Sequence, residues 1–205
     1  MKTLKSSQIP PIFLTLCLLL PLLLSTGCSK KSQTSAPAVN AICIASDCDS
    51  NLVQRVASFA RNELDSKISI TSLTSRDISS YNRNPNKMVK SLSGKYTFTV
   101  MLLDNPKKLP DSDQVNNLAI LSINMLKPST NAVEALGRRI EKETMCQIGR
   151  MIGMEPCPII FCAMFQAQDD ADLDTKGRNF CPPCGAKAGE LLKAKGLLNP
   201  EPIEK

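Results

Sequence analysis

The sequence predicts a single α/β (α+β) domain, and three features of the chain support this assignment. Short apolar runs alternate with longer amphipathic stretches between residues 39 and 198, as strands alternate with helices in layered domains. That region, roughly 160 residues long, can bury a substantial core. A cysteine-rich segment follows the longest amphipathic stretch and predicts a small, metal-stabilised C-terminal part.

Strands and helices are expected in alternation along this domain. The predicted strands, rich in β-branched and apolar residues, cover 39–45, 68–73, 96–103 and 118–123. The shorter predicted helices cover 51–64, 87–92 and 185–197. A Pro- and Asp-rich loop is expected over 105–114.

The longest helix is predicted to follow Pro128, with Asn131 and Glu134 forming a capping box and Gly153 at the turn that ends it. Apolar residues recur on it at helical spacing and form one face: Val133, Leu136, Ile140, Ile148 and Ile152. At about 100° per residue, Cys146 and Arg150 lie nearly opposite Ile148. These two side chains therefore share a face turned away from the apolar stripe.

The first 28 residues are predicted to be a targeting segment. Lys2 and Lys5 precede an apolar run over 12–24 that is too short for a comfortable membrane span. The segment ends in Leu24-Ser-Thr-Gly-Cys28, which resembles a bacterial lipobox, although Ser25 stands where an aliphatic residue is usual. We therefore expect a lipoprotein acylated on Cys28, with a plain signal peptide or an uncleaved anchor as the alternatives.

This anchor places the protein in the bacterial cell envelope, with its domain in the periplasm or at the surface. Ser29 favours the outer membrane, by analogy with enterobacterial sorting. Residues 29–38 are small and polar and predict a flexible tether, 39–198 the folded domain, and 199–205 a tail. The net charge of +6 comes with no basic stripe interleaved with aromatic residues, which argues against a nucleic-acid partner.

Two close cysteine pairs carry the clearest chemical signal. A C-x4-C pair and a C-x2-C pair stand eighteen residues apart, at Cys157, Cys162, Cys181 and Cys184. Four thiolates at such spacing are typical of one structural zinc ion per chain. Two disulfides are the alternative, because an exported domain meets oxidising conditions. The same conditions allow a small disulfide between Cys43 and Cys48. Cys146 then has no predicted cysteine partner.

Gly153, Met164 and the four clustered cysteines keep the spacing of a protease signature. In that signature an HExxHxxG helix precedes C-x4-C-x-M and a closing CxxC, and the run from Asp172 to Cys181 looks like its DTDxKxxxFC. In these residues the chain resembles the archaemetzincins, a branch of the metzincin zinc metalloproteases. The resemblance implies a metzincin-like twisted sheet with two long helices and a smaller C-terminal part.

The same register shows that the catalytic residues are replaced. Cys146 and Arg150 stand at the first two histidine positions, Pro156 at the third, and Gln147 at the position of the general-base glutamate. Arginine is a permanent cation, proline offers no side-chain ligand, and glutamine cannot accept a proton from metal-bound water. The chain contains no histidine at all. We therefore expect a degenerate, catalytically inactive member with a binding or envelope role.

Other functions remain open from the sequence. Cys181-Pro-Pro-Cys184 before a helix is also typical of thiol-disulfide oxidoreductases. A residual metallopeptidase and an unrelated metal-binding or metal-sensing lipoprotein are further alternatives. The face that carries Cys146 and Arg150 is either part of an ordinary core helix or a residual cleft that holds a protein or peptide partner.

Overall fold

The computed structural model describes residues 42–47, 49–64, 68–74, 84, 90, 92, 96–104, 106, 117–129 and 132–198. The predicted targeting segment, tether, helix over 87–92 and loop over 105–114 therefore lie wholly or mostly outside the described residues. Among the described residues, no helix has the length and apolar content that a membrane crossing requires.

The strands of the described part form one parallel sheet in the order β2-β1-β3-β4. Their bounds are β1 Ile42–Ser46, β2 Ile70–Thr74, β3 Phe98–Leu103 and β4 Leu118–Ser122. The four predicted strands are confirmed to within a few residues at their ends. The sequence did not show the order of the strands, because parallel neighbours are joined by crossovers rather than by tight turns.

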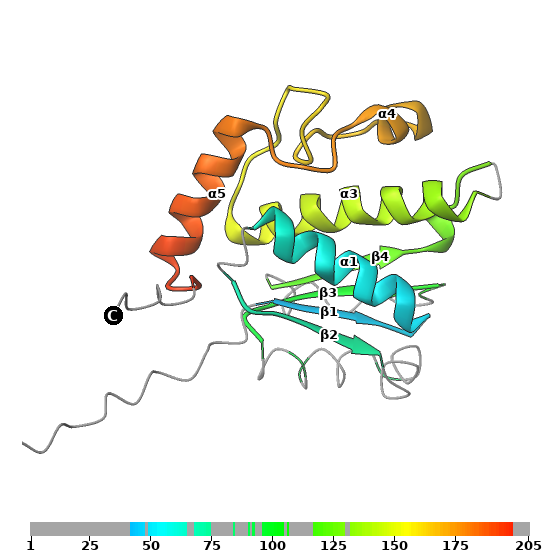
Figure 1. Ribbon diagram of the computed structural model, residues 1–205, viewed down its shortest axis with the longest axis horizontal. Helices are drawn as coiled ribbons and strands as arrows, with labels where there is room; N and C mark the ends of the chain where they lie inside the picture. Colours follow the sequence, from blue (N-terminus) through cyan, green and yellow to red (C-terminus); the bar gives the residue numbers. More distant parts are fainter. Residues whose placement is uncertain are drawn as a thin grey trace, which may run out of the picture. The chain divides into compact units, whose positions relative to one another are not determined.

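Two long helices lie over one face of this sheet, as Figure 1 shows. Helix α1 spans Ser50–Glu63, and the Asp49 carboxylate caps it by accepting a hydrogen bond from Asn51 N at 2.9 Å. Helix α3 spans Val133–Ile152 and ends at Gly153, whose φ of 103° is left-handed. The short 3-10 helix η3 (Asn124–Leu126) precedes α3.

The period of two along the strands divides the core between the two faces of the sheet. Ile42 and Ile44 of β1 face α1 and α3, where they join Val56, Ile140 and Ile148 in the main core. Cys43 and Ala45 of the same strand point to the opposite face, where Met101 and Leu103 surround them. Since both faces of β1 and β3 are covered, these strands are buried along their whole length and mostly apolar, as in other parallel sheets.

The start of α3 differs from the sequence-based prediction. The residue that precedes the helix is Ala132, which makes no side-chain cap, and Glu134 pairs instead with Arg55 of α1 at 2.6 Å. Val133, expected on the apolar face, is 82% exposed. The expected capping box and the first position of the apolar stripe are therefore wrong, whereas Ile140, Ile148 and Ile152 are fully buried.

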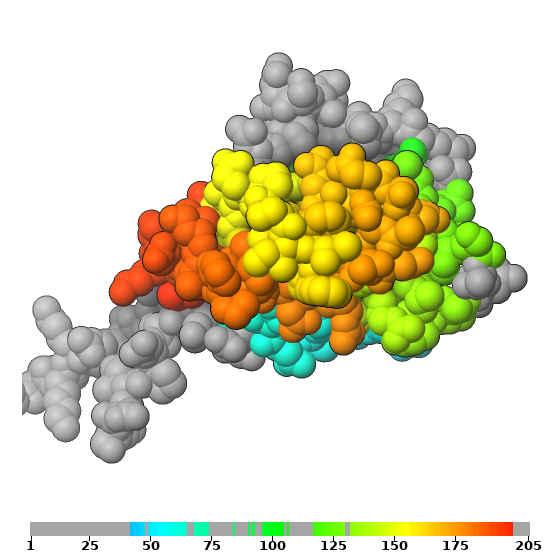
Figure 2. Space-filling model, turned by 90° about the horizontal axis from the view of Figure 1, so that it is seen from above, coloured from blue at the N-terminus to red at the C-terminus, as the bar shows by residue number. Residues whose placement is uncertain are grey.

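The chain after α3 forms the smaller C-terminal part. Residues 153–180 cover α3 on the face away from the sheet and include a six-residue helix, α4 (Asp170–Thr175), that the sequence did not predict. Figure 2 shows this segment, in yellow and orange, on the upper surface. Helix α5 spans Pro182–Ala194 and begins three residues earlier than predicted, because proline is well suited to the first turn.

Candidate functional site

The four clustered cysteines converge on one point between the loop after α3 and the start of α5. Their sulfur atoms, Cys157, Cys162, Cys181 and Cys184 Sγ, all lie within 4.8 Å of one another. The Cys157 and Cys181 sulfurs are 3.8 Å apart, which matches the edge of about 3.8 Å expected for a tetrahedron with zinc–sulfur bonds of about 2.3 Å. All four are free thiols, so the cluster fits one zinc ion.

Backbone hydrogen bonds shape the loop that carries the first cysteine pair. Cys157 N donates to Met164 O at 3.0 Å, and Ala163 N donates to Asn179 O at 2.8 Å, which ties the loop to the segment before α5. Gly177 passes so close to the Phe161 carbonyl that a Cβ at this position would collide with it. The C-x4-C loop and the C-x2-C turn are thus held together by backbone contacts as well as by their sulfurs.

The four sulfurs do not share one electrostatic environment: the pKa of Cys181 is lowered, whereas burial raises the pKa of Cys162 and of Cys184. Cys162 Sγ accepts hydrogen bonds from Met164 N and Cys181 N, both at 3.4 Å. Burial alone would raise the pKa of Cys181, but hydrogen bonds from the Cys184 backbone and from the neighbouring thiols lower it overall. Cys181 also stands at the N-cap position of α5, where the helix dipole stabilises a thiolate. Thiolates are the form that binds zinc.

The second cysteine pair faces the first rather than an open surface. Cys162 is the fully buried member of the cluster, and burial raises its pKa. Because the CPPC sulfurs already lie against two further thiols, the arrangement suits a closed four-ligand site better than a dithiol that reacts with other proteins.

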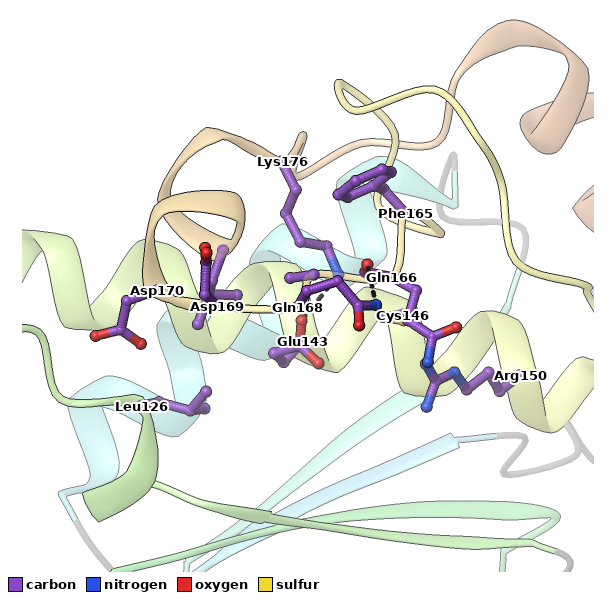
Figure 3. A pocket seen from close by; sticks show the side chains of 12 residues that line it. Leu126, Glu143, Cys146, Arg150, Phe165, Gln166, Gln168, Asp169, Asp170 and Lys176 are labelled. Atoms are coloured by element: carbon purple, nitrogen blue, oxygen red, sulfur yellow. Dashed lines mark hydrogen bonds and ion pairs between the residues drawn. The ribbon is translucent and has the colours of Figure 1, made fainter.

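A separate pocket of about 350 Å³ lies on the other side of the C-terminal segment, against α3. It is lined by Cys146 and Arg150, the residues at the first two histidine positions, as Figure 3 shows. The remaining lining comes mainly from residues 165–170 and from Lys176. The face of α3 that the sequence singled out therefore does form the wall of a cavity, although Cys146 itself is only 1% exposed.

Gln147 and Pro156 do not share this pocket. Gln147 is half-buried on α3 and Pro156 is exposed after the helix, and neither is among the residues that line the cavity. The structure thus brings together two of the four replaced positions. Burial raises the pKa of the Cys146 thiol, although the nearby Lys176 and Arg150 oppose this effect.

An ion pair between Lys176 and Glu143 occupies the middle of the pocket. Lys176 Nζ lies 2.8 Å from Glu143 Oε1, and the two side chains are only 1% and 19% exposed. A second interaction joins the same segments, because Arg139 donates to both carboxylate oxygens of Asp174 at 2.6 and 2.7 Å. These contacts hold α4 and the following turn against α3.

Sequence reasoning missed these charged residues. Lys176 and Asp174 belong to the run that matches the DTDxKxxxFC signature, and this match was the one signal that could have identified them. Arg139 and Glu143 carry no such signal, because charged residues on a long helix are usually exposed. Of the other predicted site residues, Cys43 is a fully buried free thiol, while Cys28 and Cys48 lie outside the described residues.

Comparison with solved structures shows which fold this is. The chain matches the archaemetzincin of Methanopyrus kandleri with a TM-score of 0.56 and 18% identity, over 78% of this chain and 99% of that one. The fold is that of the archaemetzincins. A zinc-dependent peptidase from Methanocorpusculum labreanum matches over 72% of this chain and 99% of its own, with a TM-score of 0.53 and 16% identity.

Two further comparisons add to this finding. The archaemetzincin of Archaeoglobus fulgidus, solved in complex with malonate, matches with a TM-score of 0.53 and 20% identity over 71% of this chain and 98% of that one. In sequence, an archaemetzincin of Thermococcus kodakarensis is 33% identical over 73 residues. That match spans 34% of this chain and 39% of the relative's length. No protein-family model matches the chain.

The archaemetzincin-like fold, the α/β class and the zinc-compatible cysteine cluster were all expected from the sequence, and all three are confirmed.

Proposed function

We propose that this protein is a catalytically inactive, archaemetzincin-like lipoprotein of the bacterial cell envelope, with one structural zinc ion and a binding role. One observation carries the proposal. The four-cysteine cluster is complete, whereas Cys146 and Arg150 occupy the cavity wall where a zinc peptidase would place two histidines.

The chemistry of that wall argues against a catalytic metal. Cys146 is the one potential ligand among the four replaced positions, and its thiol is held protonated by burial. Arg150 places a fixed positive charge beside it, which repels a divalent cation and supplies no ligand. Gln147 cannot take a proton from water. A hydrolytic mechanism that uses metal-activated water therefore has neither its metal ligands nor its base.

A zinc ion bound by the four cysteines would have a structural role. Four thiolates leave no open position for water, so the ion would stabilise the fold rather than activate a nucleophile. Its coordination would tie the C-x4-C loop to α5 and thereby support the segment that covers the pocket.

Metal content and peptide cleavage measured on the same full-length preparation test this proposal. We expect one zinc per chain and no cleavage of a mixed peptide library, with or without a chelator. A second tightly bound zinc, or cleavage that a chelator stops and that Gln147→Ala abolishes, would overturn it. Zinc-free protein with Cys157, Cys162, Cys181 and Cys184 joined as disulfides would refute the structural-zinc part.

The anchor is a separate part of the proposal and needs its own test. The lipobox-like ending at Gly27-Cys28 supports acylation of Cys28. Metabolic labelling with a fatty acid should mark the wild type but not Cys28→Ala, which should accumulate unprocessed or leave the membrane fraction. Cys17→Ala, which changes a cysteine within the predicted leader, serves as the control and should be labelled normally. Equal labelling of Cys28→Ala and the wild type would exclude a lipid on this residue.

A further inference from the structure

The pocket against α3 contains one cation that no described residue neutralises. Arg150 is exposed at the last turn of α3 and lines the cavity. Within the described part of the chain, its guanidinium has no hydrogen-bond or ion-pair partner, unlike the lining cation Lys176, which is paired with Glu143. A planar guanidinium with five unused donors is a natural binding group for a carboxylate.

The two aspartates that line the pocket, Asp169 and Asp170, lie away from Arg150. Asp170 is 3.4 Å from Arg139, which stands eleven residues before Arg150 on α3. Eleven residues correspond to about 16 Å along a helix. Figure 3 shows the same separation, with Asp169 and Asp170 at one end of the pocket and Arg150 at the other. The Arg150 end is therefore locally positive, although the pocket as a whole is not.

The groups around Arg150 suit the body of a small ligand. Gln166 offers an amide that can donate or accept hydrogen bonds, and the Phe165 ring supplies a partly buried apolar wall. The Lys176–Glu143 pair in the middle carries no net charge, so it neither attracts nor repels a neutral chain. The volume of about 350 Å³ is near the lower limit for ligand sites, which favours a ligand the size of a short peptide end.

We propose that this pocket binds a small ligand by its terminal carboxylate, which belongs either to a peptide C-terminus or to a small organic acid. Both carboxylate oxygens would contact the guanidinium of Arg150. The proposal rests on the proposed function, since a catalytic zinc at this wall would be incompatible with Arg150. Here the fixed cation of arginine would replace the metal as the group that holds an oxygen-bearing ligand. The ligand would be bound without being cleaved.

Calorimetric titration of the full-length protein tests this site with defined probes. N-acetyl-Ala-Ala carries the carboxylate, and N-acetyl-Ala-Ala-amide is identical except for that charge. We expect the acid to bind at least about tenfold more tightly than the amide, because charge-assisted bidentate contacts are about twice as strong as neutral ones. Acetate distinguishes the sources: weaker binding than the dipeptide indicates a peptide end, and equal binding indicates small organic acids.

Substitutions at Arg150 and at a matched position complete the experiment. Arg150→Ala should weaken binding of the acid about tenfold or more without affecting the amide, and Arg150→Lys should retain part of the preference. Arg138→Ala removes a cation from the same helix outside the pocket and should bind like the wild type. Equal affinities for acid and amide, unchanged binding by Arg150→Ala, or no binding of either probe would overturn the proposal.

Mass spectrometry of the probes after each titration separates this proposal from the proposed function. Intact probes together with an Arg150-dependent preference for the acid support both. Cleaved probes contradict the inactive assignment, whereas intact probes without any acid preference contradict the carboxylate site alone.

Discussion

The side chain of Met164 lies directly against Gly149 in the last turn of α3. A Cβ atom at position 149 would collide with Met164 Sδ, so any larger residue here requires the buried Met164 side chain to move. In the sequence Gly149 stands between Cys146 and Arg150, which line the pocket, and Met164 follows Cys162 by two residues. This contact therefore joins the zinc-compatible loop to the helix that carries the replaced catalytic positions.

Gly149→Ala should destabilise the protein despite the better helix propensity of alanine. Overpacking a tight core costs about 1–3 kcal/mol, whereas an alanine in a helix gains about 1 kcal/mol over glycine. Gly189→Ala in α5 is the matched control, because a Cβ there meets nothing within 4 Å. Urea unfolding should show lower stability for the first variant and equal or higher stability for the second. Equal stabilisation by both would contradict the contact.

Loss of one cysteine of the cluster should release the metal. Cys184→Ser opens a four-ligand site, and we expect the purified variant to lose its zinc and to melt well below the wild type. Cys146→Ala is the control, because Cys146 is also a free thiol but lies outside the cluster. It should keep one zinc per chain by elemental analysis. Native-like melting of metal-free Cys184→Ser with reduced thiols would count against a structural zinc.

The buried ion pair in the pocket should matter far more than a similar pair at the surface. Lys176→Met leaves the Glu143 carboxylate without its partner at 2.8 Å, and breaking one side of a buried pair costs about 3 kcal/mol. Lys187→Met removes a lysine from an exposed pair with Glu190 and should change stability by less than about 0.5 kcal/mol. Chemical denaturation of both variants compares them directly. If Lys176→Met does not change the free energy of unfolding, Lys176 and Glu143 do not form a buried ion pair.

The buried thiol of Cys43 predicts a loss of stability at alkaline pH. Burial raises the pKa of this thiol to about 12, above the value of about 8.5 for an unfolded cysteine. The folded state then keeps its proton while the unfolded chain loses it, so stability falls as the pH rises between these values, by up to about 1.4 kcal/mol per pH unit. The prediction applies to the reduced protein.

The difference between the wild type and Cys43→Ala isolates this effect, because all other alkaline titrations are common to both. Between about pH 7.5 and pH 10.5, the stability advantage of the wild type over the variant should shrink by about 2–3 kcal/mol in urea unfolding. A constant difference across this range would show that the thiol ionises equally easily in both states.

The helices and strands that have a clear local pattern of apolar residues could be predicted from the sequence. Alternation and apolar composition located all four strands, and the long apolar stripe located α3. The pattern could not show where the sheet stops covering the helix, and so Val133 was expected inside but is exposed. Helix α4, with six residues, is too short for a helical period to be recognised.

The metal site was predictable for a different reason. Two close cysteine pairs separated by a short segment are typical of one tetrahedral site, so Cys157 and Cys184 could be placed together from the sequence alone. The ion pairs of Lys176 and Arg139 join segments more than thirty residues apart, and nothing in local spacing shows which acid each cation meets. Local spacing also cannot show that the Arg150 guanidinium has no ion-pair partner among the described residues.

The catalytic positions offer a final test, because they can be restored. A single change such as Arg150→His should bring neither a second zinc nor peptidase activity, since the other ligands and the base are still missing. The fourfold change of Cys146, Arg150 and Pro156 to His and Gln147 to Glu supplies three ligands and a base. Because the fold is that of the archaemetzincins, we expect this variant to hold two zinc ions per chain by elemental analysis. Gln147 and Pro156 lie outside the pocket wall. If the fourfold variant folds but holds only one zinc ion, the backbone around these two positions no longer matches that of an active zinc site.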